Sequence, residues 1–313
     1  MTAFKYDAIV IGGSASGLSA TLAIARALVS VVCVDTGKPC NIFSKESHNY
    51  LTHDNESPSS IKRVAREQVE KYPNASFIDD EVVSIIRQDD KETFTVRTKD
   101  NPDVLNARNI IIATGMNDNI EASNIKNLGQ FWGNSIFTCG YCHGFEYAGK
   151  QAGLYASNEM FLKIMVPIVY NWNKNLTVFG SQTAIDQLSE NKELSKRGIN
   201  TISHSPIAEI VGDGTQIESV ILENGDKIDL DVLYYVPNSV INMRDLITRL
   251  GVELDGMGFI KVDKQSQMTN IPGIYAAGDC TTMMRSLAVA TQTGQLAGAS
   301  LTHKLFGQHW TSF

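Results

Sequence analysis

Residues 6–17 read YDAIVIGGSASG, a short apolar run that leads directly into a glycine-rich turn, and this stretch decides the fold. The Ala-rich spacing of residues 18–27 then predicts a packed helix, and the apolar run 29–34 predicts a second buried strand that ends at Asp35. A strand, turn, helix and strand within about 30 residues predict parallel strands joined by a crossover helix. The sequence therefore predicts an α/β protein.

The turn has the features of a dinucleotide-binding site. Gly12 permits a tight turn, and Gly17 permits close packing of helix on strand. Asp35, 23 residues beyond Gly12, has the spacing of the acid that accepts hydrogen bonds from an adenosine ribose. The backbone N–H groups expected to bind the pyrophosphate are those at the helix start, Ser14, Ala15 and Ser16. Ser14 replaces the usual middle glycine, and an ordinary strand-to-helix turn is the structural alternative.

Two further strand ends favour a flavin dinucleotide. Ala113-Thr114-Gly115 follows the run NIII at 109–112, and Gly278-Asp279 follows the run IYAA at 274–277, a combination typical of flavoproteins with two dinucleotide-binding domains. Asp279 could accept hydrogen bonds from the ribityl chain. The helix predicted to begin near residue 286 would point its positive end at the flavin pyrimidine edge. The residues expected at that end are Arg285, Ser286 and Leu287.

Residues 138–144 read TCGYCHG and contain the candidate redox site. Cys139 and Cys142, two residues apart, can close a small disulfide ring, and a helix starting there would lower the pKa of the first thiol. Structural zinc and two inert buried cysteines are the alternatives. Zinc would need a second ligand pair, which the scattered remaining cysteines do not supply, so no metal site is predicted. His143 could transfer the proton that each thiol gains or loses, or it could only cap local backbone.

Composition narrows the class of protein. The chain of 313 residues has 27 basic and 34 acidic side chains, a net charge of −7, which disfavours nucleic-acid binding. No segment reaches the roughly 18 apolar residues of a membrane span. The N-terminus lacks the cleavage site of a secretory signal, and five cysteines do not make a disulfide framework. We therefore expect a soluble cytoplasmic protein.

The order of apolar runs predicts a discontinuous first domain, 1–117 and 245–313, with a second domain inserted at 118–244. Within the first domain, single strands are predicted near 76–87, 93–98 and 258–262. The insert is expected to contain a helix over 160–172, kinked at Pro167, and a hairpin that turns at Asn224-Gly225.

The motifs GGSASGLSA, Asp35, ATG, CxxC and YAAGDC, in this order, resemble those of low-molecular-weight thioredoxin reductases along the whole chain. The resemblance implies a two-dinucleotide-binding-domain flavoprotein fold, with a Rossmann-like FAD domain and an inserted NAD(P)-type domain that carries the CxxC. It also implies a homodimer. In this family arrangement Cys142 faces the flavin and Cys139 exchanges with the substrate.

Two departures from that family refine the expectation. NADPH-dependent members have a glycine fingerprint and an arginine cluster where this chain has ASNEM at 156–160 and FGSQT at 179–183, so the inserted domain is expected to be degenerate and not to bind NADPH. His143 stands in place of the usual Asp. With Phe145-Glu146 it makes the chain similar to flavin-dependent dithiol oxidases of the gliotoxin and holomycin type. Other members without the NADPH site resemble ferredoxin-dependent and deeply rooted thioredoxin reductases.

Several functions remain open at this point. We favour an FAD enzyme that oxidises a dithiol and passes the electrons to O₂. A reductase of a thioredoxin-like protein supplied by ferredoxin or another donor, an enzyme that uses NADPH through a degenerate site, and a flavin redox sensor without turnover are the alternatives. The substrate is a dithiol or disulfide, either a small molecule or a thioredoxin-like protein.

Three further expectations concern the flavin environment. Asn49 is expected to line the flavin pocket, whereas the nearby His48 and His53 are interpreted as solvated loop residues. Trp310 could stack on the flavin, from its own chain or from the partner subunit; a frayed C-terminal tail is the alternative.

Overall fold

The computed structural model describes residues 6–89, 92–156, 159–189 and 193–311, which form two compact units. Unit 1 comprises Met1–Cys40, Ser59–Asn117 and Val240–Phe313, and unit 2 comprises Asn41–Pro58 and Asp118–Ser239. The segment 41–58 thus groups with the inserted unit rather than with the first domain, in which the sequence analysis had left it.

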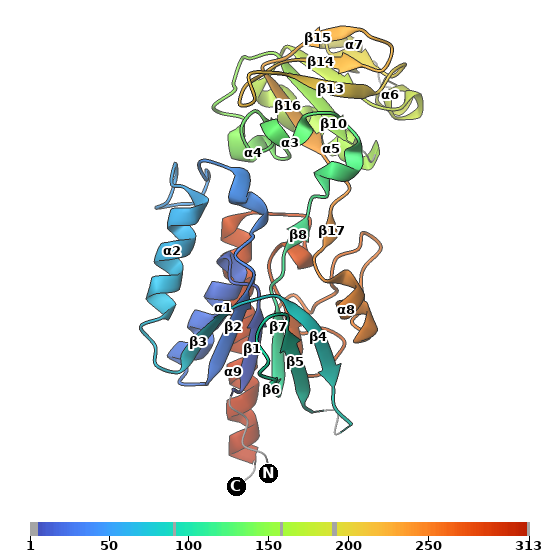
Figure 1. Ribbon diagram of the computed structural model, residues 1–313. Coiled ribbons are helices and arrows are strands. Elements are labelled where there is room, and N and C mark those ends of the chain that lie inside the picture. The colour runs from blue at the N-terminus through green and yellow to red at the C-terminus, as the bar shows by residue number, and fades with distance from the viewer. Residues whose placement is uncertain (1–5, 90–91, 157–158, 190–192, 312–313) are drawn as a thin grey trace. The chain divides into compact units, whose positions relative to one another are not determined.

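Unit 1 is built on a parallel five-stranded sheet in the order β18-β7-β1-β2-β3 (Figure 1). The strands are β1 (Ala8–Ile11), β2 (Val31–Asp35), β3 (Ala75–Asp79), β7 (Asn109–Ile112) and β18 (Ile274–Ala276). Helices α1 (Ala15–Arg26) and α9 (Leu287–Thr311) share a hydrophobic core with one face of this sheet. Gly294 and Gly298 let the two helices approach closely, because a Cβ at either position would meet the backbone of Ser16 or Ala20 within 2.6 Å.

The opposite face of this sheet shares its core with an antiparallel meander. The meander consists of β4 (Val82–Arg87), β5 (Phe94–Thr98) and β6 (Leu105–Ala107). The remaining elements of unit 1 are α2 (Pro58–Val69, of which Pro58 belongs to unit 2), α8 (Arg244–Arg249) and the short pair β8 (Met116–Asn117) and β17 (Val240–Ile241).

Two strand predictions in this unit were wrong. The single strand expected near 76–87 is two strands, because the Asp80 carboxylate accepts hydrogen bonds from the N–H groups of Glu81, Asp100 and Asn101 and ends the run. The strand expected over 258–262 is not formed. There the Asp255 carboxylate accepts from backbone N–H groups in a turn, and only a single bridge joins Leu254 to Ile260.

Unit 2 repeats the same layers although no sequence repeat is evident. Its parallel sheet has the order β12-β11-β10-β16-β9, with helices over one face and an antiparallel meander over the other. The strands of the sheet are β9 (Ile136–Phe137), β10 (Ala152–Ala156), β11 (Leu176–Phe179), β12 (Asn200–Ile202) and β16 (Val232–Val236). The meander is β13 (Ile207–Gly212), β14 (Ile217–Leu222) and β15 (Lys227–Asp229).

The helices of unit 2 are α3 (Leu128–Phe131), α4 (Gly140–His143), α5 (Glu159–Trp172), α6 (Gln182–Ser189) and α7 (Glu193–Lys196). Helix α5 continues through Pro167, where the sequence predicted a kink. The predicted hairpin is confirmed: β14 and β15 pair antiparallel across Asn224-Gly225, and Gly225 has a φ of 92°. Short 3₁₀ turns span Cys40–Phe43, Ile120–Ser123 and Asp279–Thr281.

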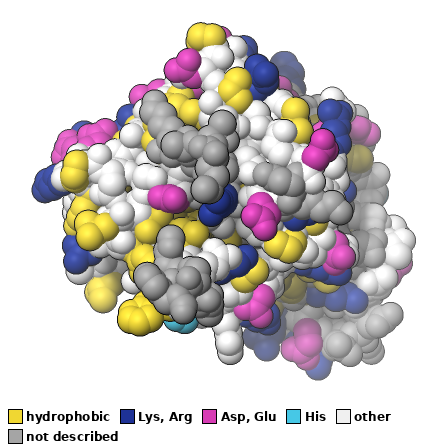
Figure 2. Space-filling view, turned by 90° about the horizontal axis from the view of Figure 1, so that it is seen from below, with side chains coloured by type: hydrophobic (Ala, Val, Ile, Leu, Met, Phe, Trp, Pro, Cys, Tyr) yellow, Lys and Arg dark blue, Asp and Glu magenta, His cyan; other side chains and the backbone are white. Residues whose placement is uncertain are grey.

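On the face drawn in Figure 2, acidic and basic side chains are interspersed and do not form a patch of one sign. This distribution differs from the clustered Lys and Arg of a nucleic-acid-binding surface. Among the described residues, none of the helices combines the length and the apolar character needed to cross a membrane.

Candidate active site and cofactor-binding residues

The glycine-rich turn at the end of β1 leaves no room for side chains at its two key positions. Gly12 has a φ of 104°, and a Cβ there would lie 2.3 Å from the Ala113 carbonyl oxygen. A Cβ on Gly17 would lie 1.7 Å from the Gly12 carbonyl oxygen. The glycine-rich turn is therefore compact enough to present backbone N–H groups at the start of α1. The first helical turn of α1, ASGL, contains no acidic residue that would compete with a bound anion.

Ser14 is the N-cap of α1, and its side chain makes no capping hydrogen bond. Its hydroxyl is therefore not used to cap the helix. Ala15 and Ser16 follow as the first helical residues, and Ser16 is buried against α9, where a Cβ on Gly278 would meet its hydroxyl oxygen at 2.5 Å.

Asp35 lies at the end of β2 beside this turn. Its Oδ1 accepts a hydrogen bond from the Gly13 N–H at 3.0 Å, and its Oδ2 pairs with the ammonium group of Lys62 at 2.7 Å. A carboxylate has about four acceptor positions, so these partners leave room for a ribose hydroxyl. Lys62, on α2, balances the negative charge and was not identified from the sequence.

The strand ends at 113–115 and 278–279 lie on neighbouring strands of the same sheet, since β7 pairs with both β1 and β18. Asn242 fixes the first of them: its side-chain amide donates to the Thr114 carbonyl at 2.7 Å, and its N–H donates to the Gly115 carbonyl at 3.2 Å. The sequence analysis did not identify Asn242, because it lies 128 residues from Thr114 in the chain and belongs to no motif.

Asp279 is paired with the residue predicted to assist it. The Arg285 Nε lies 3.4 Å from Asp279 Oδ2, and the Cys40 thiol donates to the same oxygen at 3.8 Å. Ser286 caps α9, because its hydroxyl accepts from the Val289 N–H at 3.2 Å, and Leu287 begins the helix. The structure thus brings Arg285, Ser286 and Leu287 to the N-terminus of α9, as the sequence predicted.

Trp310 lies at the other end of α9. The helix extends unfrayed to Thr311, and its rise of 1.5 Å per residue puts Trp310 about 35 Å from Leu287. The side chain is 82% exposed. Trp310 therefore lies too far away to cover a flavin at the N-terminus of its own α9. Asn49 lies in the segment 41–58 of unit 2, with a φ of 60°.

The dithiol turn in unit 2 rests on the C-terminal end of α5. Cys139 is the N-cap of the one-turn helix α4, and the Cys142 N–H donates to the Cys139 carbonyl at 3.3 Å. Gly140 and Gly144 pack on Trp172, since a Cβ on Gly144 would lie 2.7 Å from the indole. A helix thus begins at the dithiol, as the sequence analysis considered, and it is a single turn of four residues.

The next residue after Trp172 anchors the segment that follows the dithiol. Asn173 is fully buried, and its side-chain amide donates to the carbonyls of Tyr147 at 2.6 Å and Lys150 at 3.2 Å. The Gly149 N–H donates to the Trp172 carbonyl at 3.0 Å. The C-terminal end of α5 and the residue after it therefore support the dithiol turn and the segment that follows it. Cys33 and Cys280, in unit 1, are fully buried, and burial raises the pKa of each thiol to about 12, which makes them inert.

His143 is half-buried directly after Cys142. Its ring stacks on Phe137 of β9, with centroids 3.9 Å apart. Burial, and next the charge of His48, lower the pKa of His143 from 6.5 to about 4. At neutral pH this imidazole is uncharged and can accept a proton.

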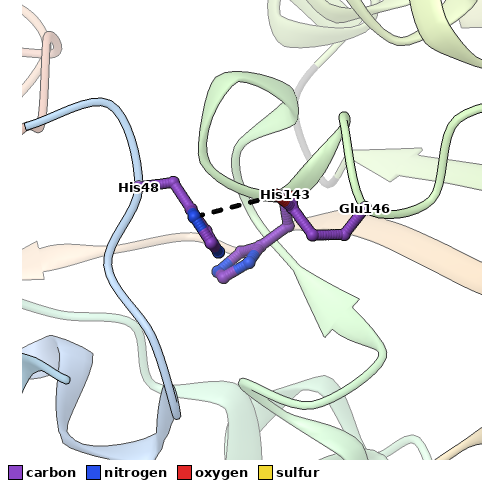
Figure 3. A group of neighbouring side chains, drawn as sticks. All are labelled: His48, His143 and Glu146. Atoms are coloured by element: carbon purple, nitrogen blue, oxygen red, sulfur yellow. Dashed lines mark ion pairs between the residues drawn. The ribbon is translucent and has the colours of Figure 1, made fainter. Parts of the chain in front are cut away.

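His48 and Glu146 complete a cluster with His143 (Figure 3). The closest ring nitrogens and carboxylate oxygen of the three lie within 4.8 Å of one another. The His48 side chain is only 9% exposed, so its interpretation as a solvated residue was wrong. A bridge between Ser47 and Glu56 closes its loop and turns His48 toward α4. His53, 36% exposed, instead pairs with Glu56 at 2.7 Å.

The loop after β11 in unit 2 contains Ser181 and Gln182, part of the stretch 179–183 in which the sequence lacks the arginine cluster expected of NADPH-dependent members. The Ser181 hydroxyl caps α6 by accepting from the Ala184 N–H, and Gln182 is bonded to Ser203 and Asp186. The sequence 180–189 contains no Lys or Arg. Ser157 and Asn158 of the corresponding loop after β10 lie outside the described residues.

Comparison with known proteins gives a consistent result. Residues 6–294 match the family model described as pyridine nucleotide-disulphide oxidoreductase. The chain is 28% identical over 316 residues to the thioredoxin reductase sirT of Leptosphaeria maculans, an alignment that covers 96% of this chain and 95% of that protein.

Solved structures agree with this match. A putative thioredoxin reductase TrxB from Bacillus anthracis superimposes with a TM-score of 0.87 at 28% identity, covering 97% of this chain and 99% of that one. The crystal structure of HlmI gives a TM-score of 0.87 at 27% identity, with 98% and 94% of the two chains covered.

Proposed function

Since the chain belongs to the pyridine nucleotide-disulphide oxidoreductase family, as a thioredoxin reductase-like disulfide oxidoreductase, we propose that Cys139 and Cys142 oxidise a dithiol substrate and that O₂ is the final electron acceptor. FAD is the cofactor, held in unit 1. One observation carries the proposal most directly: the CxxC turn is followed by His143, an imidazole that burial keeps uncharged at neutral pH.

The residues present in unit 1 fit FAD. The turn from Gly12 to Gly17 is closed to side chains and opens backbone N–H groups toward a pyrophosphate, and Asp35 has acceptor positions for the adenosine ribose. Residues 113–115, with Gly278 and Asp279, would line the ribityl chain. The N-terminus of α9, with Arg285, would stabilise negative charge on the flavin ring.

The dithiol reaction itself follows from general thiol chemistry. A substrate thiolate attacks the Cys139 sulfur of the oxidised pair, which breaks the Cys139–Cys142 bond and leaves Cys142 as a thiolate. The second substrate thiol, whose proton passes to His143, then attacks the mixed disulfide and releases the Cys139 thiolate and the substrate disulfide. Two electrons thus move from substrate to the cysteine pair. Bound FAD would accept them and deliver them to O₂, forming hydrogen peroxide.

We propose that NADPH does not supply electrons to this chain. The loop after β11 lacks the cations that a 2′-phosphate needs, and its residues are engaged with one another. The finer parts of the proposal are a homodimer, in which Trp310 of one copy could reach the flavin of the other, and a cytoplasmic location.

A second function has the support of relatives named thioredoxin reductase, among them sirT. In that case the same cysteine pair runs in reverse, reducing a thioredoxin-like disulfide with electrons that a protein donor such as ferredoxin delivers to FAD. The direction of flow distinguishes the two functions.

The experiment compares wild type with Cys139→Ser and Cys142→Ser as FAD-loaded proteins without O₂. Excess dithiothreitol should bleach the visible flavin band of the wild type and of neither variant, and admitting air should restore the band with formation of hydrogen peroxide. A wild-type flavin that no dithiol reduces would contradict the proposal. Flavin that is reduced but reoxidises only with a protein acceptor would favour the second function.

A further inference from the structure

His48 faces His143 (Figure 3), and one carboxylate lies near each of its ring nitrogens. Its Nδ1 is 3.7 Å from Glu146 Oε1, and its Nε2 is 3.9 Å from Glu46 Oε2. The His48 ring meets the His143 ring edge to face, with centroids 5.4 Å apart and planes 88° apart. Figure 3 shows His48 reaching from its own loop to His143 and Glu146.

The two imidazoles have different surroundings. One face of His143 is covered by the Phe137 ring, an apolar surface that disfavours a charged imidazolium. His48 instead has a carboxylate within 3.9 Å of each ring nitrogen, so a positive charge on this ring would have counterions on both sides. Because two positive charges this close repel each other, the pair holds one proton more readily than two.

We propose that His48 is a positioning residue that carries the positive charge of the pair, with Glu46 and Glu146 as its counterions, and so keeps His143 uncharged and ready to accept a proton from the thiol chemistry. This inference deepens the proposed function and rests on its assignment of His143 as proton acceptor. It adds a role for residues that no CxxC motif contains.

The other titratable groups that face the cluster do not change this assignment. Tyr147 follows Glu146 directly, and Tyr234 reaches the site from β16; burial raises the pKa of both phenols, so they stay uncharged at neutral pH. The two thiols of the CxxC turn are the reacting groups themselves. Glu46 and Glu146 are therefore the carboxyl groups that face His48.

The same arrangement provides a path by which a proton on His143 can reach solvent. The closest nitrogens of His143 and His48 lie within 4.8 Å, a separation that one water molecule can bridge. Beyond His48, the side chain of Glu46 is 58% exposed and can exchange protons with solvent. Once His48 has released one of its own protons towards Glu46 and solvent, its ring can accept the proton taken up by His143, which then need not return to the thiols.

The test follows the ionisation of His143 directly. NMR titration of the imidazole C2–H signals of the six histidines, in the FAD-loaded protein with EDTA present, gives the pKa of each ring. The His143 signal is identified by its loss in His143→Gln. The variants are His48→Gln, which removes the charge, and His48→Lys, which retains it. His53→Gln is the matched control from the same loop, because His53 pairs with Glu56 at 2.7 Å.

We expect His143 in His48→Gln to titrate at least about one pH unit higher than in wild type, and His48→Lys and His53→Gln to leave it near the wild-type value. The acid limb of the pH dependence of dithiol oxidation should move with it. A His143 titration that is unchanged in His48→Gln overturns the inference, and so does one that shifts equally in His48→Lys. A wild-type titration that changes when EDTA is omitted also overturns it, because a cation held by the imidazoles would then control His143.

These readouts separate the inference from the proposed function. If the NMR titration moves as expected while the pH dependence of the rate does not, His48 controls the charge of His143 but His143 is not the proton acceptor. If dithiols fail to reduce the flavin while the NMR titration moves, the proposed function fails and the link between the two imidazoles stands.

Discussion

The imidazole of His143 stacks on the phenyl ring of Phe137, with centroids 3.9 Å apart and planes 26° from parallel. This contact helps to bury the imidazole next to the dithiol, and burial is the main reason that its pKa falls to about 4. Because the unfolded chain takes up this proton near pH 6.5 and the folded chain only near pH 4, the His143 contribution to folding stability is lost as the pH falls through that window.

The first prediction concerns the pH dependence of the reaction. If uncharged His143 is the proton acceptor, the rate of dithiol-dependent flavin reduction should fall only as the pH drops through about 4, well below the 6.5 of an ordinary histidine. His143→Gln should lower the rate by about 10²- to 10⁴-fold and abolish this limb. Stopped-flow measurements across the pH range test both. His204→Gln, a change at an exposed histidine of unit 2, is the control; an inflection near 6.5 would argue against the assignment.

The second prediction isolates the contribution of Phe137. Phe137→Leu thins the apolar cover of His143, so the pKa of His143 should rise and the acid limb should move to higher pH. Phe131→Leu makes the same substitution at a buried site in another core cluster of unit 2 and should leave the limb in place. Equal shifts in both variants would show that general loosening of the unit, rather than the stacking contact, is responsible.

The third prediction concerns the packing of the dithiol turn. In Gly144→Ala the new methyl group would lie 2.7 Å from the Trp172 indole and would also collide with the Gly140 carbonyl. We expect a loss of about 1–3 kcal/mol in the free energy of unfolding and slower reaction of the dithiol. Urea unfolding and thiol-labelling rates measure the two effects. Gly129→Ala, whose methyl group would meet nothing closer than 3.9 Å, should be nearly neutral; a neutral Gly144→Ala would disprove the tight packing.

The fourth prediction concerns the adenosine end of FAD. Asp35→Ala removes the acceptor expected to bind the ribose and also releases Gly13 and Lys62. A loss of about 1.5–3 kcal/mol, roughly 10- to 150-fold in the dissociation constant of FAD, is expected for a charged hydrogen-bond partner. Reconstitution of flavin-free protein followed by flavin fluorescence gives the constant. Asp7→Ala, at the opposite end of the same strands, should bind FAD normally, and equal losses in both would point to a general folding defect.

Much of the fold could be predicted because the deciding signals are local. A few adjacent residues suffice to recognise each signal: the turn at Gly12 to Gly17, the acid at Asp35, and the strand ends at Thr114 and Asp279. These signals indicated a two-domain α/β flavoprotein fold and the disulfide oxidoreductase class, and both are confirmed. The split of the strand expected at 76–87 was missed because the Asp80 carboxylate accepts hydrogen bonds from a distant segment, through the N–H groups of Asp100 and Asn101.

The surroundings of the dithiol were less predictable. The spacing of the CxxCH motif identifies Cys139, Cys142 and His143 directly. His48, by contrast, belongs to a polar loop far earlier in the chain. No periodicity marks such a residue, since its burial depends on the Ser47–Glu56 bridge and on tertiary packing. The sequence analysis did not identify Lys62 and Asn242 for the same reason. Lys62 contacts Asp35, and Asn242 contacts Thr114, only in the folded chain.

The central claim is that electrons enter the flavin through Cys139 and Cys142 and not from NADPH. The most direct measurement mixes the FAD-loaded protein, without O₂, with dithiothreitol in one experiment and with NADPH in another, and follows the visible flavin band in a stopped-flow instrument. The account predicts rapid bleaching by the dithiol, abolished in Cys142→Ser, and no bleaching by NADPH. Rapid bleaching by NADPH, or bleaching by dithiol that persists in Cys142→Ser, would contradict it.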